Sequence, residues 1–83
     1  MSKQNAVKIL ITGSNGLLGS NLVKFFSSKN NYKVFPTSLH PSHFTNFFQG
    51  ELLDNDFVRR LTDQVHPQII INTIRFCHEV FQI

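Results

Sequence analysis

Two patterns of hydrophobic and polar residues alternate along the chain. The first is a nearly continuous apolar run, which occurs at residues 7–12 (VKILIT) and again at residues 69–74 (IIINTI). Runs of this length, rich in β-branched residues, are typical of strands that are buried on both faces of a parallel sheet. We therefore expect residues 7–12 and 69–74 to be strands of one such sheet.

The second pattern is the spacing of an amphipathic helix, first seen over residues 16–28. Its apolar stripe comprises Leu18, Leu22 and Phe25 at i, i+4 and i+7, widened by Val23 and Phe26. Stripes of this kind mark the face of a helix that packs against a core. Ser14 or Asn15 is expected to cap the N-terminus, because both side chains accept hydrogen bonds from the N–H groups of a first turn.

The helical spacing recurs over residues 54–65. The face that we expect to be buried comprises Phe57, Val58, Leu61 and Val65. Asp54 is in the place of an N-cap. Pro67 ends the predicted helix, because the residue before a proline avoids the helical region.

Shorter segments complete the predicted sheet. Residues 32–38 (YKVFPTS) form a second strand, which we expect to pair in parallel with residues 7–12 through a right-handed crossover. Residues 39–46 are a polar loop, and residues 47–49 are a brief third strand. The expected fold is α/β: a partial Rossmann fold, a doubly wound parallel sheet of three to four strands with two helices.

Three glycines stand between the first predicted strand and the first predicted helix. Gly13 allows a tight turn at the strand's end, Gly16 lets the backbone approach phosphate groups, and Gly19 lets the helix pack closely on the strand. The free N–H groups of the first helical turn then face an anion such as a pyrophosphate. This arrangement predicts a nucleotide site. Its expected residues are Gly13, Ser14, Asn15, Gly16, Leu17, Leu18 and Gly19.

Residues 11–19 (ITGSNGLLG) resemble the opening of the extended short-chain dehydrogenase/reductases. The similarity is greatest to the dTDP-4-dehydrorhamnose reductase-like members and to the related regulatory β subunits of methionine adenosyltransferase. It extends over residues 7–73 and implies that residues 1–83 are the truncated N-terminal part of a single NAD(P)-binding Rossmann domain. Residues 75–83 are an atypical tail that does not resemble the family.

The resemblance also implies further contacts to a dinucleotide cofactor. Glu51 and Leu52 match the family's adenine-contacting stretch, with Glu where the family has Asp. Asn72 matches the polar residue that follows the family's fourth strand. Small residues come next in the family, whereas Ile74 and Arg75 are large. These two side chains either block the path of the cofactor or, in the case of Arg75, contact phosphate.

The end of the second predicted strand bears on the choice of cofactor. An acidic residue there would bind the ribose 2′-OH of NAD, but residues 37–40 are Thr-Ser-Leu-His. Hydroxyl groups such as that of Ser38 suit the 2′-phosphate of NADP better, although the arginine that often accompanies them is missing. NADP is therefore expected in preference to NAD, and NAD stays open.

No catalytic residue is predicted in this chain. Hydride-transferring members of the family use a Tyr-x-x-x-Lys pair, whereas the single tyrosine here, Tyr32, is followed four residues later by Pro36. The parent protein that the resemblance implies is an oxidoreductase that reduces a nucleotide-activated keto-sugar. The alternatives are a non-catalytic, dinucleotide-binding regulatory subunit and a non-functional truncated product.

Composition and charge bear on which partners, metals and cellular location we expect. A net charge of +3 with scattered basic residues predicts no nucleic-acid partner, and the lack of an apolar run near ~18 residues predicts no membrane span. The single cysteine, Cys77, suits the reducing cytoplasm, and no spacing of His, Cys or acidic residues predicts a metal site. An incomplete sheet has an open edge, so we also expect a protein partner that covers it.

Overall fold

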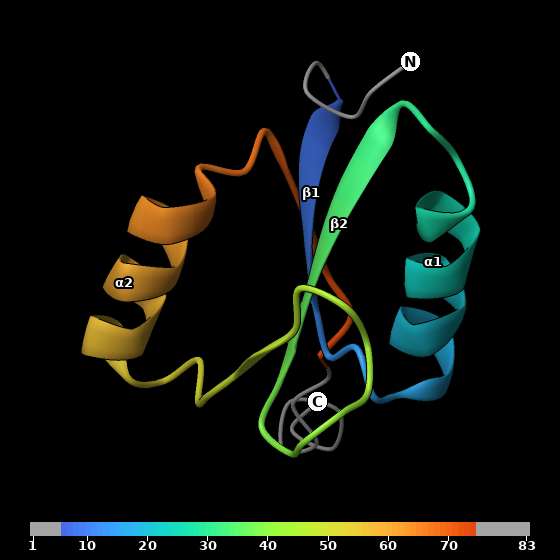
Figure 1. Cartoon of the computed structure of the whole chain (residues 1–83). Helices are drawn as coiled ribbons and strands as arrows, with labels where there is room; N and C mark the ends of the chain where they lie inside the picture. The colour runs from blue at the N-terminus through green and yellow to red at the C-terminus, as the bar shows by residue number, and fades with distance from the viewer. Residues whose placement is uncertain (1–5, 75–83) are drawn as a thin grey trace, which may run out of the picture.

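The computed structural model describes residues 6–74, which form one four-stranded sheet with two helices (Figure 1). In chain order the elements are β1 (Val7–Thr12), α1 (Leu17–Ser27), β2 (Tyr32–Ser38), β3 (Phe48–Gln49), α2 (Asn55–Val65) and β4 (Ile69–Asn72). The strand order is β3-β2-β1-β4, and all pairs are parallel. The predicted α/β fold is thus confirmed. The predictions for residues 75–83, Arg75 among them, lie outside the described residues.

The carboxyl ends of the strands are level at one edge of the sheet. Thr12 is the register partner of Thr37 in β2 and of Asn72 in β4. β3 joins the same edge through Phe48, which pairs with Thr37. The loops that follow these strands therefore lie close together, at the edge where open α/β sheets bind their ligands.

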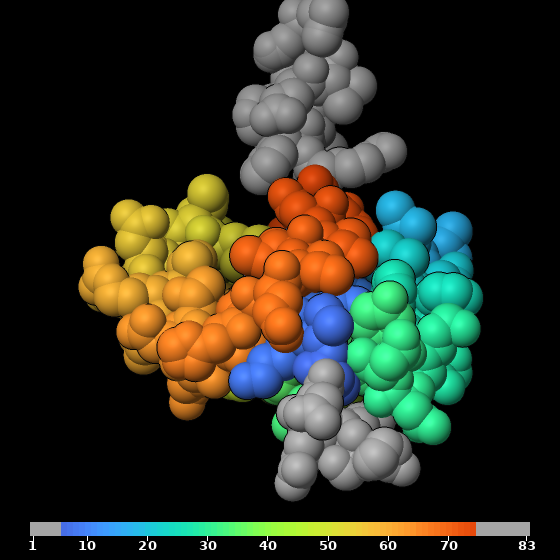
Figure 2. Space-filling model, turned by 90° about the horizontal axis from the view of Figure 1, so that it is seen from above, coloured from blue at the N-terminus to red at the C-terminus, as the bar shows by residue number. Residues whose placement is uncertain are grey.

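Alternating side chains of the sheet form a hydrophobic core on each face. Towards α1 the buried residues are Ile9, Ile11, Val23 and Val34, and towards α2 they are Leu10, Phe35, Leu61 and Val65. Figure 2, viewed from above, shows the two helices as layers on opposite sides of the strands. Successive residues of a strand point to opposite faces, which explains why the apolar run in β1 is nearly continuous.

The face of α1 that packs on the sheet agrees only in part with the predicted stripe. Gly19 and Val23 are buried, whereas Leu18 and Phe25 are 61% and 54% exposed. The cause is Gly19, which has no side chain and therefore comes into contact with the turn after β1. This contact directs the Gly19 side of the helix to the sheet. The prediction is correct for Val23 and for Leu22 and Phe26, which are partly buried against the same core. It is wrong for Leu18 and Phe25.

The N-cap of α1 is Gly16, and the predicted capping role of Ser14 or Asn15 is wrong. Ser14 Oγ donates a hydrogen bond to Thr37 O at 3.1 Å, and Asn15 Nδ2 donates to His40 O at 3.0 Å. Both side chains therefore join the glycine turn to β2 and the loop after it. They are not available to the N–H groups of the helix.

α2 begins and ends as predicted. Asp54 Oδ1 accepts hydrogen bonds from Asp56 N at 3.0 Å and from Phe57 N at 3.3 Å, so Asp54 is the N-cap. The last helical residue is followed by His66 in the left-handed conformation, at φ 52°, and then by Pro67. A left-handed residue and a following proline are common ends of helices.

β4 ends at Asn72, although the apolar run predicts a strand that continues to residue 74. Asn72 Oδ1 accepts a hydrogen bond from Ile74 N at 3.0 Å, which turns the backbone out of the sheet. Asparagine side chains commonly compete in this way with the backbone pairing of a strand. The strand is therefore shorter than its hydrophobic pattern.

Candidate nucleotide-binding site

The packing of the chain itself requires glycine at two positions of the turn between β1 and α1. Gly13 has φ +71°, and a Cβ there would lie 2.5 Å from Thr73 Oγ1. A Cβ on Gly19 would collide with the carbonyl oxygen of Gly13. At both positions a side chain would force the backbone to shift. The turn after β1 and the first turn of α1 are thus in direct contact.

Gly16 differs from the other two glycines. Its φ of −77° and ψ of 172° are extended values that any residue adopts. A Cβ at this position would meet Gly13 O at 3.4 Å, an ordinary van der Waals distance, and nothing else in residues 6–74 within 4 Å. The fold of the described residues therefore does not require glycine here. The space beside Gly16 is free for a ligand.

The first turn of α1 presents backbone N–H groups to this space. Ser20 N donates a hydrogen bond to Gly16 O at 2.9 Å, which closes the first turn. The N–H groups that precede such a bond have no acceptor within the helix, and they carry the positive end of the helix dipole. Leu17 and Leu18, which follow the N-cap, are exposed. The backbone at this end of the helix is therefore suited to binding an anion.

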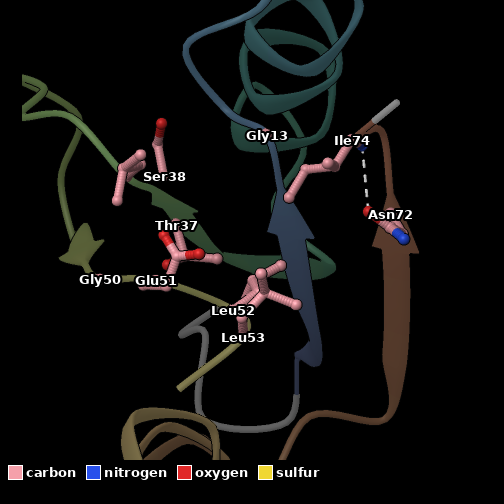
Figure 3. A pocket seen from close by; sticks show the side chains of 10 residues that line it. Gly13, Thr37, Ser38, Gly50, Glu51, Leu52, Leu53, Asn72 and Ile74 are labelled. Carbon is pink, nitrogen blue, oxygen red and sulfur yellow. Dashed lines mark hydrogen bonds between the residues drawn. The ribbon is translucent and has the colours of Figure 1, made fainter. Parts of the chain in front are cut away.

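A pocket of about 290 Å³ lies at the carboxyl edge of the sheet, next to the glycine turn (Figure 3). Five predicted site residues line it: Gly13, Ser38, Glu51, Leu52 and Asn72. The lining also includes five residues outside the predicted binding set: Thr37, Leu39, Gly50, Leu53 and Ile74. Ile74 is one of the two large residues that the resemblance places in the path of the cofactor. The other predicted residues, 14–19, lie on the glycine turn and in the first turn of α1, outside the pocket.

Most of the additional lining residues lie where a strand ends and the chain turns. Thr37 is buried and its Oγ1 donates to Phe48 O at 2.7 Å, so this hydroxyl is used within the sheet. Gly50 packs against the ring of Phe57, with which a Cβ at position 50 would collide. Ile74 follows the turn after β4. What these residues share is their place near a strand end, not their chemistry.

The pocket is mostly apolar and contains a few polar side chains. Ser38 is half-buried, and Glu51 is exposed at the pocket's border. Asn72 Oδ1 accepts hydrogen bonds from Thr12 Oγ1 at 2.6 Å and from Ile74 N at 3.0 Å, which leaves the amide Nδ2 as its donor. Leucine side chains with a few polar groups are the usual lining of a small-molecule site.

The loop after β2 is tied to the glycine turn and to β3. Asn15 Nδ2 donates hydrogen bonds to His40 O at 3.0 Å and to Pro41 O at 3.2 Å. Gln49 Nε2 donates to Leu39 O at 3.2 Å. These bonds hold the backbone that borders the pocket. The shape of the pocket therefore depends partly on side chains that do not line it.

A second pocket, of about 440 Å³, lies beside α1 and the loop after β2. Its lining includes Lys24, Lys33 and His43 but none of the predicted site residues. Lys33 directs its Nζ to the Phe35 ring, 5.6 Å from the ring centre, on the opposite face of the sheet.

Among residues 6–74, neither a metal-ligand cluster nor a helix able to span a membrane is found. The candidate site is therefore the glycine turn and the pocket next to it.

Comparison with known proteins gives one family match. A family model described as the NAD dependent epimerase/dehydratase family matches residues 9–80. No match was found among curated protein sequences.

Solved structures with the same fold include a dTDP-glucose 4,6-dehydratase from Bacillus anthracis str. Ames, in complex with NAD. Its TM-score is 0.72 at 21% identity, over 93% of this chain and 29% of that chain. The L-threonine dehydrogenase of Phytophthora infestans has a TM-score of 0.71 at 18% identity, over 90% and 26% of the two chains. The L-threonine dehydrogenase of Clostridium difficile has a TM-score of 0.70 at 20% identity, over 95% and 28%. The chain thus spans less than a third of each structure, and the likeness concerns the fold.

Proposed function

Since the chain belongs to the NAD dependent epimerase/dehydratase family, we propose that it binds a nicotinamide dinucleotide at the carboxyl edge of its sheet. The pyrophosphate would lie on the first turn of α1, and the adenosine would lie in the adjacent pocket. A bound dinucleotide of this kind supplies hydride chemistry, while the residues of this chain bind and orient it.

Gly16 is the observation that carries this proposal. Its backbone conformation and its surroundings are compatible with any small side chain. Because Gly16 has no side chain, the space in front of the N–H groups of the first turn is free. A pyrophosphate held by those groups must come close to the backbone. Gly13 and Gly19 support the proposal less specifically, because internal packing already explains them.

We infer roles for four pocket residues from the family resemblance together with their place in the pocket. Leu52 packs against the adenine, and Glu51 accepts a hydrogen bond from the adenosine. Ser38, at the end of β2, lies towards the 2′ position of the ribose. Asn72 donates from Nδ2, because two partners already use its Oδ1.

We propose NADP as the preferred cofactor. Residues 37–40, at the end of β2, contain no carboxylate that would bind a 2′-OH. Glu51 is the acid that does line the pocket, and its charge opposes a 2′-phosphate. Glu51→Gln should therefore strengthen NADPH binding and change NADH binding little. Tighter binding of NADH than of NADPH by the wild-type chain would overturn the preference for NADP.

A fluorescence titration of the full chain with NADPH and NADH tests dinucleotide binding, with two variants at Gly16. Gly16→Asp and Gly16→Asn both introduce a favourable N-cap residue, so both should keep the fold. Aspartate adds a negative charge in front of the N–H groups and should weaken binding by at least about tenfold. Asparagine adds similar bulk without charge and should weaken it less. If the wild-type chain has a native circular dichroism spectrum but binds neither nucleotide, the proposal is wrong.

For the whole protein we propose the reduction of a nucleotide-activated keto-sugar, as in dTDP-4-dehydrorhamnose reductase-like proteins. The likeness in fold to a dTDP-glucose 4,6-dehydratase supports a nucleotide-sugar substrate. Within these 83 residues Tyr32 is followed four residues later by Pro36, so we expect no hydride transfer by this chain alone. The test is NADPH oxidation by the longest product of the gene, with dTDP-4-dehydrorhamnose as substrate.

The second candidate is a non-catalytic regulatory subunit that binds a dinucleotide and assists a partner enzyme. The β4 edge, which is unpaired within residues 6–74, leaves room for such a partner. Co-purification of an enzyme whose activity changes with NADPH, without NADPH oxidation by the chain, would favour this candidate.

A cytoplasmic location, suggested by the single cysteine Cys77, is a further proposal that cell fractionation tests.

A further inference from the structure

Ile74 lies at the point of the sheet where the strand order reverses. The chain passes from β1 to β2 and β3 on one side, and then to β4 on the other side of β1. Dinucleotides cross an open α/β sheet at this place, with one half of the ligand on each side. Ile74 lines the pocket, and its Cγ1 is 3.2 Å from the position of a Cβ on Gly13 (Figure 3).

Hydrogen bonds to β1 hold the backbone around Ile74. Ile74 N donates to Asn72 Oδ1 at 3.0 Å, and the same oxygen accepts from Thr12 Oγ1 at 2.6 Å. Thr73 Oγ1 donates to Thr12 O at 2.7 Å and lies 3.2 Å from Gly13 O. The β-branched side chain of isoleucine is itself restricted in χ1. The side chain is therefore kept beside the end of β1.

The pocket is small for a whole dinucleotide. Its volume of about 290 Å³ is just below the usual range for small-molecule sites, about 300–1,000 Å³. The lining on the β2 and β3 side is open to an adenosine, and the glycine turn is open to a diphosphate. A ligand that continues across β1 towards β4 meets Ile74 and Thr73.

We propose that Ile74 is a specificity-determining residue that confines the site to the adenosine diphosphate half of a dinucleotide. The inference rests on the proposed dinucleotide site, because the same pocket and glycine turn hold that half. It favours the non-catalytic candidate over keto-sugar reduction, which needs the nicotinamide half. The nicotinamide riboside half then adds no affinity, and ADP binds this chain as tightly as NAD⁺. Both ligands lack a 2′-phosphate, so the comparison is independent of the preference for NADP.

Calorimetric titration of the full chain with ADP and NAD⁺ tests the proposal. We expect the two dissociation constants to agree within about threefold for the wild type, since the nicotinamide half makes no net contribution. Ile74→Ala should tighten NAD⁺ binding by about tenfold, the effect of removing a few methyl groups from a pocket, and leave ADP binding unchanged. Leu53→Ala is the matched control, because Leu53 lines the pocket away from β4 and should affect both ligands equally.

The outcomes separate this proposal from the one on which it rests. Wild-type NAD⁺ binding that is about tenfold tighter than ADP binding would overturn the role of Ile74 and leave the dinucleotide site in place. An equal effect of Ile74→Ala on both ligands would also overturn it. Binding of neither ligand by a folded wild-type chain would overturn both proposals. If Ile74→Ala does not fold, Ile74→Val makes the same comparison with the loss of one methyl group.

Discussion

Gly19 lies so close to Gly13 that a side chain at position 19 would collide with the carbonyl oxygen of Gly13. This contact joins the first turn of α1 to the end of β1 and determines which face of the helix packs on the sheet. From the side of β4, Thr73 Oγ1 donates to Thr12 O at 2.7 Å and lies beside Gly13. The chain therefore encloses the glycine turn on two sides, and the side at Gly16 stays open.

Gly19→Ala should lower the free energy of unfolding by about 1–3 kcal/mol, because the added methyl group forces α1 away from the Gly13 carbonyl. Urea denaturation followed by circular dichroism measures the change. Asn21→Ala is the control, since Asn21 is exposed on the same helix and alanine favours helix. If the two variants are equally stable, the contact between Gly19 and Gly13 is not important for packing.

The hydrophobic pattern predicts the elements of this fold well, because strands and helices follow directly from the spacing of apolar residues. β2, at residues 32–38, and the Asp54 cap of α2 are both as predicted. The pattern fails for part of the face of α1. Leu18 and Phe25 have the correct spacing for a core stripe, but one backbone contact at Gly19 turns them towards solvent.

Part of the candidate site could also be predicted from the spacing of residues in the sequence. Glycine spacing identifies the turn, because backbone approach restricts those positions to one residue type. Thr37 and Gly50 line the pocket only because separate strands end at one edge, and this depends on the register of the sheet. Ile74 is anticipated by the resemblance, in which small residues follow the position of Asn72. The roles of the site residues in binding a cofactor stay predictions.

Asn72→Leu should lower the free energy of unfolding by about 1–3 kcal/mol, because Thr12 Oγ1 and Ile74 N both lose their acceptor. Asn72→Asp keeps an acceptor oxygen in the same place and should retain most of the stability. Its negative charge should nevertheless weaken NADPH binding. Thermal denaturation and titration of both variants measure the two effects, and a loss of stability as large for aspartate as for leucine would contradict the acceptor role.

Asp54→Ala should lower the free energy of unfolding by about 1 kcal/mol, because the N–H groups of Asp56 and Phe57 lose their cap. Asp56→Ala is the matched control, since it removes an exposed ion pair with Arg59 at 3.4 Å, and such pairs contribute little. Urea denaturation compares the two variants. The capping role is refuted if Asp56→Ala proves the more destabilising.

Asn15→Ala should weaken NADPH binding by about fivefold, because residues 39–41 must then be ordered when the nucleotide binds. The free energy of unfolding should change by less than about 1 kcal/mol, since both hydrogen bonds are exposed. Fluorescence titration and urea denaturation measure the two quantities. Asn21→Ala, on the exposed side of α1, should change neither. Unchanged NADPH affinity in Asn15→Ala would show that the loop needs no tie to the glycine turn.

Ile70→Lys should reduce self-association of the chain. β4 pairs with β1 on one side, and within residues 6–74 no strand pairs with its other side. Ile69 and Ile70 are 41% and 57% exposed there, and the residues around β4 form an exposed surface between the two helices (Figure 2).

Open edges with apolar side chains associate with other chains, and a lysine on such an edge opposes this pairing. Sedimentation velocity at increasing protein concentration measures the association. Thr45→Lys adds the same charge to the exposed loop after β2 and should leave the association unchanged. If Ile70→Lys associates as strongly as the wild type, the edge of β4 is not the contact surface.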